Sequence, residues 1–458
     1  MEQSIYTRYS VNRLILIFSM PAILSLIVEL MTGVIDTAFA GHLGGVSEAA
    51  LTAMGLAAPL LGLFVAVQSL FAVSTAITVS SLFGSQDRRS LDSHLQTGII
   101  MTIVLNTLLS LAVWLMLDPL LGALGAAGEA LLQARAYMSV LLISNVFSSV
   151  GYLLTSVIRA FGHPKTEMVI ITASVVLNIA ANAVLTFGLQ LGMTGIALGT
   201  LVSELICAAV AMLWLKKKGF WFVYRHLPLS ETMAITRRLI IIGSVQTVLQ
   251  SLAGLTAFFV NRQLLEYAGA VQVGAWAVAN KVYMLLLMPI IGLTQSVQSI
   301  LAYFSGRGER DKQRAVSVRT ILITAAYGIA GAAASFSAGG WIAGLMSGSS
   351  EVTDQAAVML DLLFLTFPLV GITYTVITLL QVTGYEKQSL LIASFRQVLV
   401  VIPLILVLPY AVQSLELQLA PALSVLAAIP IADLLTLLLA LYLGRKASKP
   451  LQETVRIS

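Results

Sequence analysis

Long apolar segments follow one another through most of the chain, and they restrict its possible folds more than any other feature. A helix needs about twenty apolar residues to cross the hydrocarbon core of a bilayer. Twelve segments of at least this length lie at 14–40, 50–83, 95–117, 131–158, 167–189, 194–215, 239–264, 273–304, 316–345, 354–382, 390–411 and 419–444. Only 10% of the residues are charged, against about 25% in soluble proteins. The sequence therefore predicts an all-α membrane protein with twelve transmembrane helices.

The cationic residues lie in alternate loops between these segments. All but four of the 26 Lys and Arg fall in the N-terminal segment, in the loops within 88–89, 159–165, 216–238, 307–319 and 387, or after 444. The four exceptions are Arg135, Arg262, Lys281 and Arg396. Because cytoplasmic loops attract Lys and Arg, we expect a multi-pass protein of the cell membrane with both termini in the cytoplasm. The same pattern accounts for the net charge of +5 without nucleic acid as a partner.

Short sequence matches indicate that the second half of the chain repeats the first. The loop FGSQDRR (83–89) corresponds to FSGRGER (304–310), and GHPK (162–165) corresponds to GYEK (384–387), in the same order. We therefore predict an N-terminal six-helix bundle (1–215), a cytoplasmic linker (216–238) and a C-terminal six-helix bundle (239–458). Six helices per half give parallel repeats related by a pseudo-two-fold axis along the membrane normal, as in secondary transporters with alternating access.

Polar residues from three predicted helices form a candidate cation site. A charged side chain at the bilayer centre costs about 2.5–3.5 kcal/mol, so Asp36 in the first helix is a candidate proton acceptor. Asn178 and Asn182 lie four residues apart, on one face of the fifth helix. Thr200 in the sixth helix lies at a similar predicted depth. These residues are our candidates for proton coupling; structural hydrogen bonding between helices is the alternative.

Other residues are candidates for the substrate cavity or for conformational change. Pro21 removes a backbone hydrogen bond from the helix that carries Asp36, so it is a candidate conformational switch. We expect an ion pair between Arg396 and Asp433, and no metal site around the single Cys207. The candidate cavity residues are Glu29, Met31, Gly33, Asn261, Met284 and Met288.

Three stretches of the chain resemble the multidrug and toxic compound extrusion (MATE) family, most closely its DNA-damage-inducible protein F branch. They are PAILSLIVELMTGVIDTAFAGHLGGVSEAALTAMGLAAP (21–59), GHPKTEMVIITASVVLNIAANAVLTFG (162–188) and GMTGIALGTLVSE (192–204). The resemblance implies two six-helix bundles that export cationic and amphipathic drugs against proton or sodium influx. It also implies that Asp36 is the family's coupling aspartate, with Asn178, Thr200 and Pro21 as its matching partners.

One departure from the family pattern bears on the coupling ion. The family often has Asp where this chain has Asn182, and one carboxylate fewer favours a proton over sodium. We therefore expect a proton-coupled multidrug exporter without a cofactor, acting as a monomer on small cationic or amphipathic compounds within membrane lipid. The alternatives are a sodium-coupled drug antiporter and a flippase for lipid-linked precursors. An enzyme is not expected, since the chain has no HExxH, GxSxG or Walker A sequence.

The predicted topology is testable with single cysteines in a Cys207→Ala background. Lys217→Cys lies on the predicted cytoplasmic side and Ser47→Cys on the opposite side, so a membrane-impermeant maleimide applied to intact cells should label only Ser47→Cys. Permeabilised cells should give labelling of both variants. Labelling of Lys217→Cys in intact cells would contradict the assignment.

Overall fold

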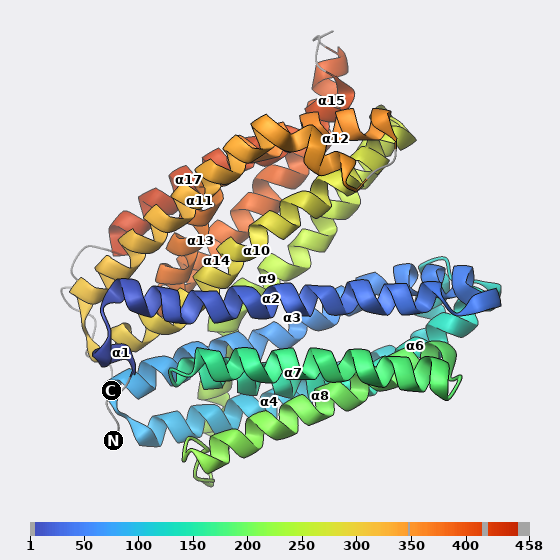
Figure 1. Ribbon diagram of the computed structural model, residues 1–458. Coiled ribbons are helices and arrows are strands. Elements are labelled where there is room, and N and C mark those ends of the chain that lie inside the picture. The colour runs from blue at the N-terminus through green and yellow to red at the C-terminus, as the bar shows by residue number, and fades with distance from the viewer. Residues whose placement is uncertain (1–4, 347–348, 415–419, 448–458) are drawn as a thin grey trace. The chain divides into compact units, whose positions relative to one another are not determined.

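All regular structure in the part of the chain that the structure describes is helical. The structure is a computed structural model that describes residues 5–346, 349–414 and 420–447 (Figure 1). Residue 419, the predicted start of the last span, and the predicted cytoplasmic charges after residue 447 lie outside these ranges. The elements in chain order are α1 (Ile5–Arg8), α2 (Val11–Gly41), the 3₁₀ turn η1 (Gly44–Val46), α3 (Ser47–Ser85), α4 (Arg88–Leu115), α5 (Leu117–Ala123), α6 (Gly128–Ala160), α7 (Pro164–Ala183), the π-helix η2 (Val184–Gly188), α8 (Gly192–Lys217), α9 (Leu229–Tyr267), α10 (Ala270–Arg307), α11 (Arg310–Gly344), α12 (Ser350–Phe364), α13 (Phe367–Val382), α14 (Glu386–Ser394), the π-helix η3 (Phe395–Val401), α15 (Ile402–Ser414), α16 (Pro421–Leu426) and α17 (Ala428–Ala447).

The number of membrane spans agrees with the sequence prediction. Within the described ranges, eleven helical stretches are each long and apolar enough to cross a bilayer. A twelfth span is formed by α12 and α13 together, which are bent by 46° at the break between them. Pro368 lies in the first turn of α13, where its missing N–H and its ring prevent the hydrogen bond to the carbonyl four residues earlier that would continue the helix of α12. The predicted all-α fold is confirmed, with the tenth predicted segment (354–382) present as a broken span.

The chain divides into two compact units whose boundary differs from the predicted domain boundary. Unit 1 comprises Met1–Gln250 with Ala302–Arg310, and unit 2 comprises Ser251–Leu301 with Asp311–Ser458. The predicted linker 216–238 and the start of α9 therefore pack with unit 1, and so does the end of α10. Counting apolar spans cannot reveal this division, because α9 and α10 are single helices of 39 and 38 residues that each contribute to both units.

Side chains of α4 hold the segment between α8 and α9 within unit 1. The Arg88 guanidinium donates a hydrogen bond to the Trp221 carbonyl at 2.7 Å. The Gln96 side-chain amide donates to the Arg225 carbonyl and accepts from the Arg225 N–H, both at 3.0 Å. Gln96 thus satisfies both backbone groups of one residue in a segment that has no helix of its own to satisfy them. The connection is an ordered part of unit 1.

The membrane helices of unit 1 lie side by side (Figure 1). α6 packs on α3, α4 and α8, while α7 packs on α2 and α8. Two apolar cores fill the spaces between them, one around Met138 and Ile196 and the other around Leu95 and Leu153. This packing brings α2, α7 and α8, the three helices with the predicted polar cluster, into contact with one another.

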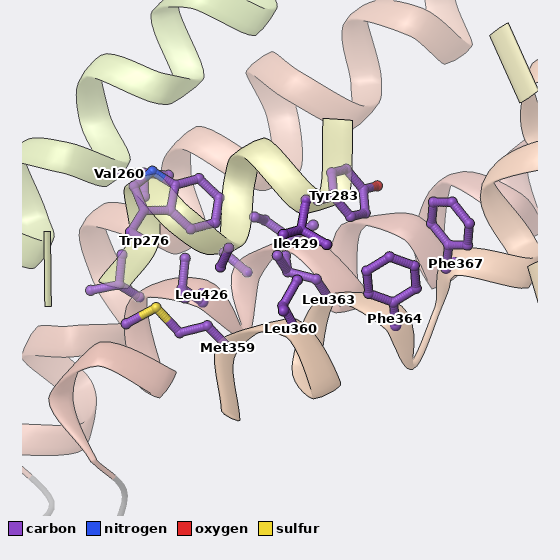
Figure 2. Packing of buried hydrophobic residues seen from close by; sticks show 14 of the residues in the cluster. Val260, Trp276, Tyr283, Met359, Leu360, Leu363, Phe364, Phe367, Leu426 and Ile429 are labelled. Atoms are coloured by element: carbon purple, nitrogen blue, oxygen red, sulfur yellow. The ribbon is translucent and has the colours of Figure 1, made fainter. Parts of the chain in front are cut away.

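Unit 2 has its own apolar core, in which aromatic rings meet at the break between α12 and α13 (Figure 2). The ring of Tyr283 lies edge-on to Phe364 and Phe367, with centroid separations of 5.8 and 5.6 Å. Edge-to-face pairs of this kind are favoured by the ring quadrupole. The broken span is therefore packed into the core of unit 2 through its aromatic side chains.

The fifth span of each half contains a π-helical segment, which the sequence analysis did not predict. η2 directly follows α7, and η3 lies between α14 and α15. A π-helical turn is rare and adds a residue to the local turn, which changes the direction of the side chains around it. The two segments are a structural counterpart of the predicted sequence repeat.

Tyr6 anchors the short helix α1 to unit 1. Its side chain is 1% exposed, its hydroxyl donates to the Ala160 carbonyl at 2.8 Å, and its ring stacks on Tyr303 with centroids 4.1 Å apart. Burial raises the pKa of the Tyr6 hydroxyl, so it remains a hydrogen-bond donor at physiological pH. Tyr303 in turn lies against Gly84, where a Cβ would collide with the Tyr303 carbonyl. These contacts join α1, α3, α6 and the end of α10.

Replacing Tyr6 should therefore destabilise the protein. We expect Tyr6→Ala to lower the thermal unfolding midpoint strongly, because truncating a buried aromatic side chain costs about 3–5 kcal/mol. Tyr6→Phe should have a smaller effect, since it removes one hydrogen bond worth about 1 kcal/mol. Size-exclusion chromatography after heating in detergent gives the midpoint. Tyr224→Ala, at a position 64% exposed, is the control. A Tyr6→Ala variant as stable as this control would contradict the proposed anchor.

Candidate functional site

Asp36 lies in the second half of α2 and is held by an amide of α7. Its carboxylate is nearly buried, with 7% of the residue exposed. Its Oδ1 accepts a hydrogen bond from the Nδ2 of Asn182 at 2.6 Å. Asn182 itself is completely buried. The interaction joins α2 and α7 at a point where both polar groups are buried.

The hydrogen bonds continue from Asn182 to α8. Asn182 Nδ2 also donates to Asn178 Oδ1 at 3.3 Å, and Asn178 Nδ2 donates to Thr200 Oγ1 at 3.2 Å. The Thr200 hydroxyl donates to the Ile196 carbonyl at 3.3 Å. The structure thus brings all four predicted coupling residues into one network, which we call the Asp36 network (Asp36, Asn182, Asn178 and Thr200). Asp36 is its one titratable member and its terminal acceptor.

Small residues on α8 allow this close approach. A Cβ at Gly199 would collide with the side chain of Asn182, and a Cβ at Gly195 would lie within 2.8 Å of the backbone of Thr186. Interfaces between membrane helices favour such small residues, which let the backbones approach closely. Gly199 therefore fixes the position of the Asn182 amide, and with it the hydrogen bond to Asp36.

A cavity of about 280 Å³ adjoins the Asp36 network within unit 1. Asn178 and Thr200 contribute to its wall, so one end of the network faces the cavity while Asp36 is not among the residues that line it. The lining comes from α2, α3, α6, α7 and α8, and it consists of Glu29, Thr32, Gly33, Gln68, Ser148, Gly151, Tyr152, Thr155, Ile171, Ser174, Val175, Asn178, Thr200, Ser203, Glu204 and Cys207.

The structure gathers some of the predicted cavity residues and separates others. Glu29 and Gly33 line this cavity, but Met31, two residues after Glu29, does not. Met31 is 46% exposed, because side chains two apart on a helix point in different directions. The remaining candidates, Asn261, Met284 and Met288, belong to unit 2, so they are not part of the unit 1 cavity.

Pro21 lies within α2, which continues through it without a break from Val11 to Gly41. The Ser25 hydroxyl donates to the Pro21 carbonyl at 2.9 Å. Its role as a conformational switch remains a prediction.

Glu204 is the principal cavity residue that the sequence analysis left without a role. It lies four residues after Thr200 and therefore on the same face of α8, a spacing that could have identified it. Ser174 lies four residues before Asn178 and therefore on the same face of α7. Gln68 and Ser148 have no comparable spacing from a residue of the Asp36 network in the sequence, because only the packing of α3 and α6 brings them to the cavity.

Two other membrane carboxylates are paired with arginine, unlike Asp36. Arg396 and Asp433 form the predicted ion pair in unit 2 at 2.8 Å, and Asp433 also accepts from Thr366 at 2.9 Å. Arg159 and Glu167 form a buried pair in unit 1 at 2.9 Å, which the sequence analysis did not predict. Each of these carboxylates has a positive charge directly beside it, whereas the partner of Asp36 is the neutral amide of Asn182.

An all-helical membrane fold with a polar cavity among its helices defines the protein as a multi-pass membrane transporter, and comparison with known proteins agrees. The MatE family model matches residues 21–184 and again residues 244–407, once in each half of the chain. The chain belongs to the MatE family. The double match also agrees with the repeat seen in the sequence.

Curated relatives and solved structures are similar over nearly the whole chain. The chain is 24% identical over 403 residues to the multidrug export protein MepA of Staphylococcus saprophyticus, covering 88% of each protein. It is 24% identical over 396 residues to MepA of Staphylococcus aureus, covering 85% of this chain and 86% of the relative.

Among solved structures, the fold is similar to a mutant of the MATE transporter VcmN from Vibrio cholerae, with a TM-score of 0.87, 19% identity and coverage of 95% of this chain and 97% of that one. It is equally similar to a MOP superfamily transporter from Pyrococcus furiosus, with a TM-score of 0.87, 21% identity and coverage of 99% of both chains.

The close approach at Gly199 gives a test of the Asp36 network. Alanine normally stabilises a helix relative to glycine by about 1 kcal/mol, but at Gly199 the added Cβ must displace Asn182. We expect Gly199→Ala to lower the thermal unfolding midpoint, because overpacking costs about 1–3 kcal/mol. Gly55→Ala, where a Cβ would meet nothing within 4 Å, should leave the midpoint unchanged or raise it. Equal midpoints for the two variants would contradict the packing described here.

Proposed function

We propose that this protein is a secondary active multidrug exporter. It moves small cationic or amphipathic organic compounds out of the cell by alternating access, in exchange for protons that flow inward. The observation that carries the proposal is the Asp36 network, in which one buried carboxylate without a cationic partner is connected by two amides to the wall of a polar cavity. The curated relatives named as multidrug export proteins support the same function.

Protonation of Asp36 would change the contact between α2 and α7. The ionised carboxylate accepts a charge-assisted hydrogen bond from Asn182, which is about twice as strong as a bond between neutral groups. A proton on Asp36 removes the charge and weakens this bond. The strength of the contact between α2 and α7 then depends on whether Asp36 is protonated. Coupling of proton binding to a conformational change requires such a dependence.

A cationic substrate and the proton would exclude each other for an electrostatic reason. A cation in the cavity is stabilised by the negative charge of Asp36, although the carboxylate does not line the cavity. Protonation removes this attraction, so the substrate binds less tightly when Asp36 is neutral. Reciprocally, a bound cation lowers the affinity of Asp36 for the proton.

The composition of the network favours a proton over sodium. Only one of its four members is a carboxylate, since position 182 is an amide. Hard cations are bound by cages of several oxygen ligands that usually include charged ones, whereas a proton needs only one acceptor. Sodium coupling is therefore the second candidate for the driving ion.

The cavity also bears on the alternative of a lipid-linked precursor flippase. The pyrophosphate of such a substrate requires cationic side chains. The residues that line the cavity include two glutamates and neither lysine nor arginine. This charge favours cationic compounds over anionic lipids.

The role of Asp36 is tested by Asp36→Asn in inside-out vesicles with an imposed pH gradient. We expect ethidium transport to fall at least about tenfold, because the amide has the same shape but cannot bind and release a proton. Asp354→Asn, at an exposed position of α12, is the matched control. A protonophore should abolish wild-type transport, and removal of sodium should not. Undiminished transport by Asp36→Asn at normal expression would remove Asp36 from the mechanism, and a strict requirement for sodium would favour the second candidate.

A further inference from the structure

We infer that the unit 1 cavity is a binding site for organic dications, with Glu29 and Glu204 as the two counter-charges. This inference rests on the proposed export function and specifies its substrate class. It assigns a role to two carboxylates that lie outside the Asp36 network.

The two carboxylates reach the cavity from different helices. Glu29 lies on the exposed surface of α2, Glu204 is a partly buried residue of α8, and both line the cavity. The described lining contains no lysine or arginine that could neutralise either of them. The nearby buried arginine, Arg159, is bound to Glu167.

Three hydroxyl groups of the lining donate their protons to backbone carbonyls. Ser203 donates its proton to the Thr200 carbonyl at 2.9 Å, and Ser174 donates to the Ser203 carbonyl at 3.1 Å. Thr155 donates to the Gly151 carbonyl at 2.9 Å. Because these protons are used by backbone carbonyls, the free lone pairs of the three oxygens remain for a ligand. Such a lining suits a cation and disfavours an anion.

The number of carboxylates determines the preferred ligand charge. A monocation pairs with one of them and leaves the other without a positive partner, so that the second carboxylate either stays ionised at a cost or takes up a proton. A ligand with two separated positive charges neutralises both. The volume of about 280 Å³ is near the lower end of ligand pockets, roughly 300–1,000 Å³, so the ligand is small.

Two permanently charged probes of similar length test this inference, because their charge does not change with pH. They are hexane-1,6-bis(trimethylammonium) and hexyltrimethylammonium, and their binding to the full chain in lipid nanodiscs is measured by calorimetry. We expect the wild type to bind the dication about tenfold more tightly than the monocation, which corresponds to one additional charge pair of about 1.4 kcal/mol. Equal affinity of the wild type for both probes would overturn the inference.

Charge-neutral variants assign the preference to the two residues. Glu29→Gln and Glu204→Gln should each reduce the preference, and the double variant should lose it. Glu29→Asp, which retains the charge, should keep it, and so should the control Glu48→Gln at an exposed position of α3. A double variant that still prefers the dication by the wild-type ratio would overturn the inference.

Asp36→Asn separates this inference from the proposed function. This variant should lose proton-driven transport and bind both probes more weakly, because the charge of Asp36 no longer attracts cations. It should keep most of the preference for the dication, because Glu29 and Glu204 still line the cavity. Loss of the preference in Asp36→Asn, with Glu29 and Glu204 intact, would overturn the dication site. Proton-independent transport by a wild type that prefers the dication would instead contradict only the proposed function.

Discussion

The absence of water from the bilayer core is the constraint on which the rest of this structure depends. Backbone N–H and C=O groups there must form hydrogen bonds within the protein, and an α-helix satisfies them within a single segment. Side-chain hydroxyls obey the same constraint: Thr102 and Ser296, for example, donate to carbonyl oxygens four residues earlier. Other polar side chains, such as those of the Asp36 network, find their partners on neighbouring helices instead.

Within unit 1, polar groups that serve structure and polar groups that serve function are close neighbours. The Asn182 amide holds α2 to α7 through Asp36 and holds the network together through Asn178. The same contact is the one that a proton on Asp36 would weaken. The same interaction is therefore a structural hydrogen bond and the proposed site of proton coupling. For this reason the two interpretations of these residues, structural and functional, do not exclude each other.

The two halves share a scaffold but treat their buried charges differently. The fifth span of each half contains a π-helical segment, and the family model matches each half once. In unit 1 the segment follows Asn182, whose partner Asp36 has no cationic neighbour in the hydrogen-bond network. In unit 2 the π-helix contains Arg396, which is paired with Asp433. The π-helical segment of unit 2 therefore carries one member of an ion pair, whereas that of unit 1 follows a neutral amide that is bonded to a carboxylate.

The sequence by itself determined the twelve spans and the residues of the Asp36 network, because lipid requires apolar segments of a certain length and makes an intramembrane carboxylate conspicuous. Residues four apart on one helix, such as Asn178 and Asn182, could be grouped without coordinates. Only the tertiary structure decided that Glu29 and Glu204 share a cavity, that Met31 is outside it, and that Arg159 is paired with Glu167. It also decided that the chain divides within α9. These facts depend on how separate helices pack against each other, and helical periodicity carries no information about the rotation and register of one helix relative to another.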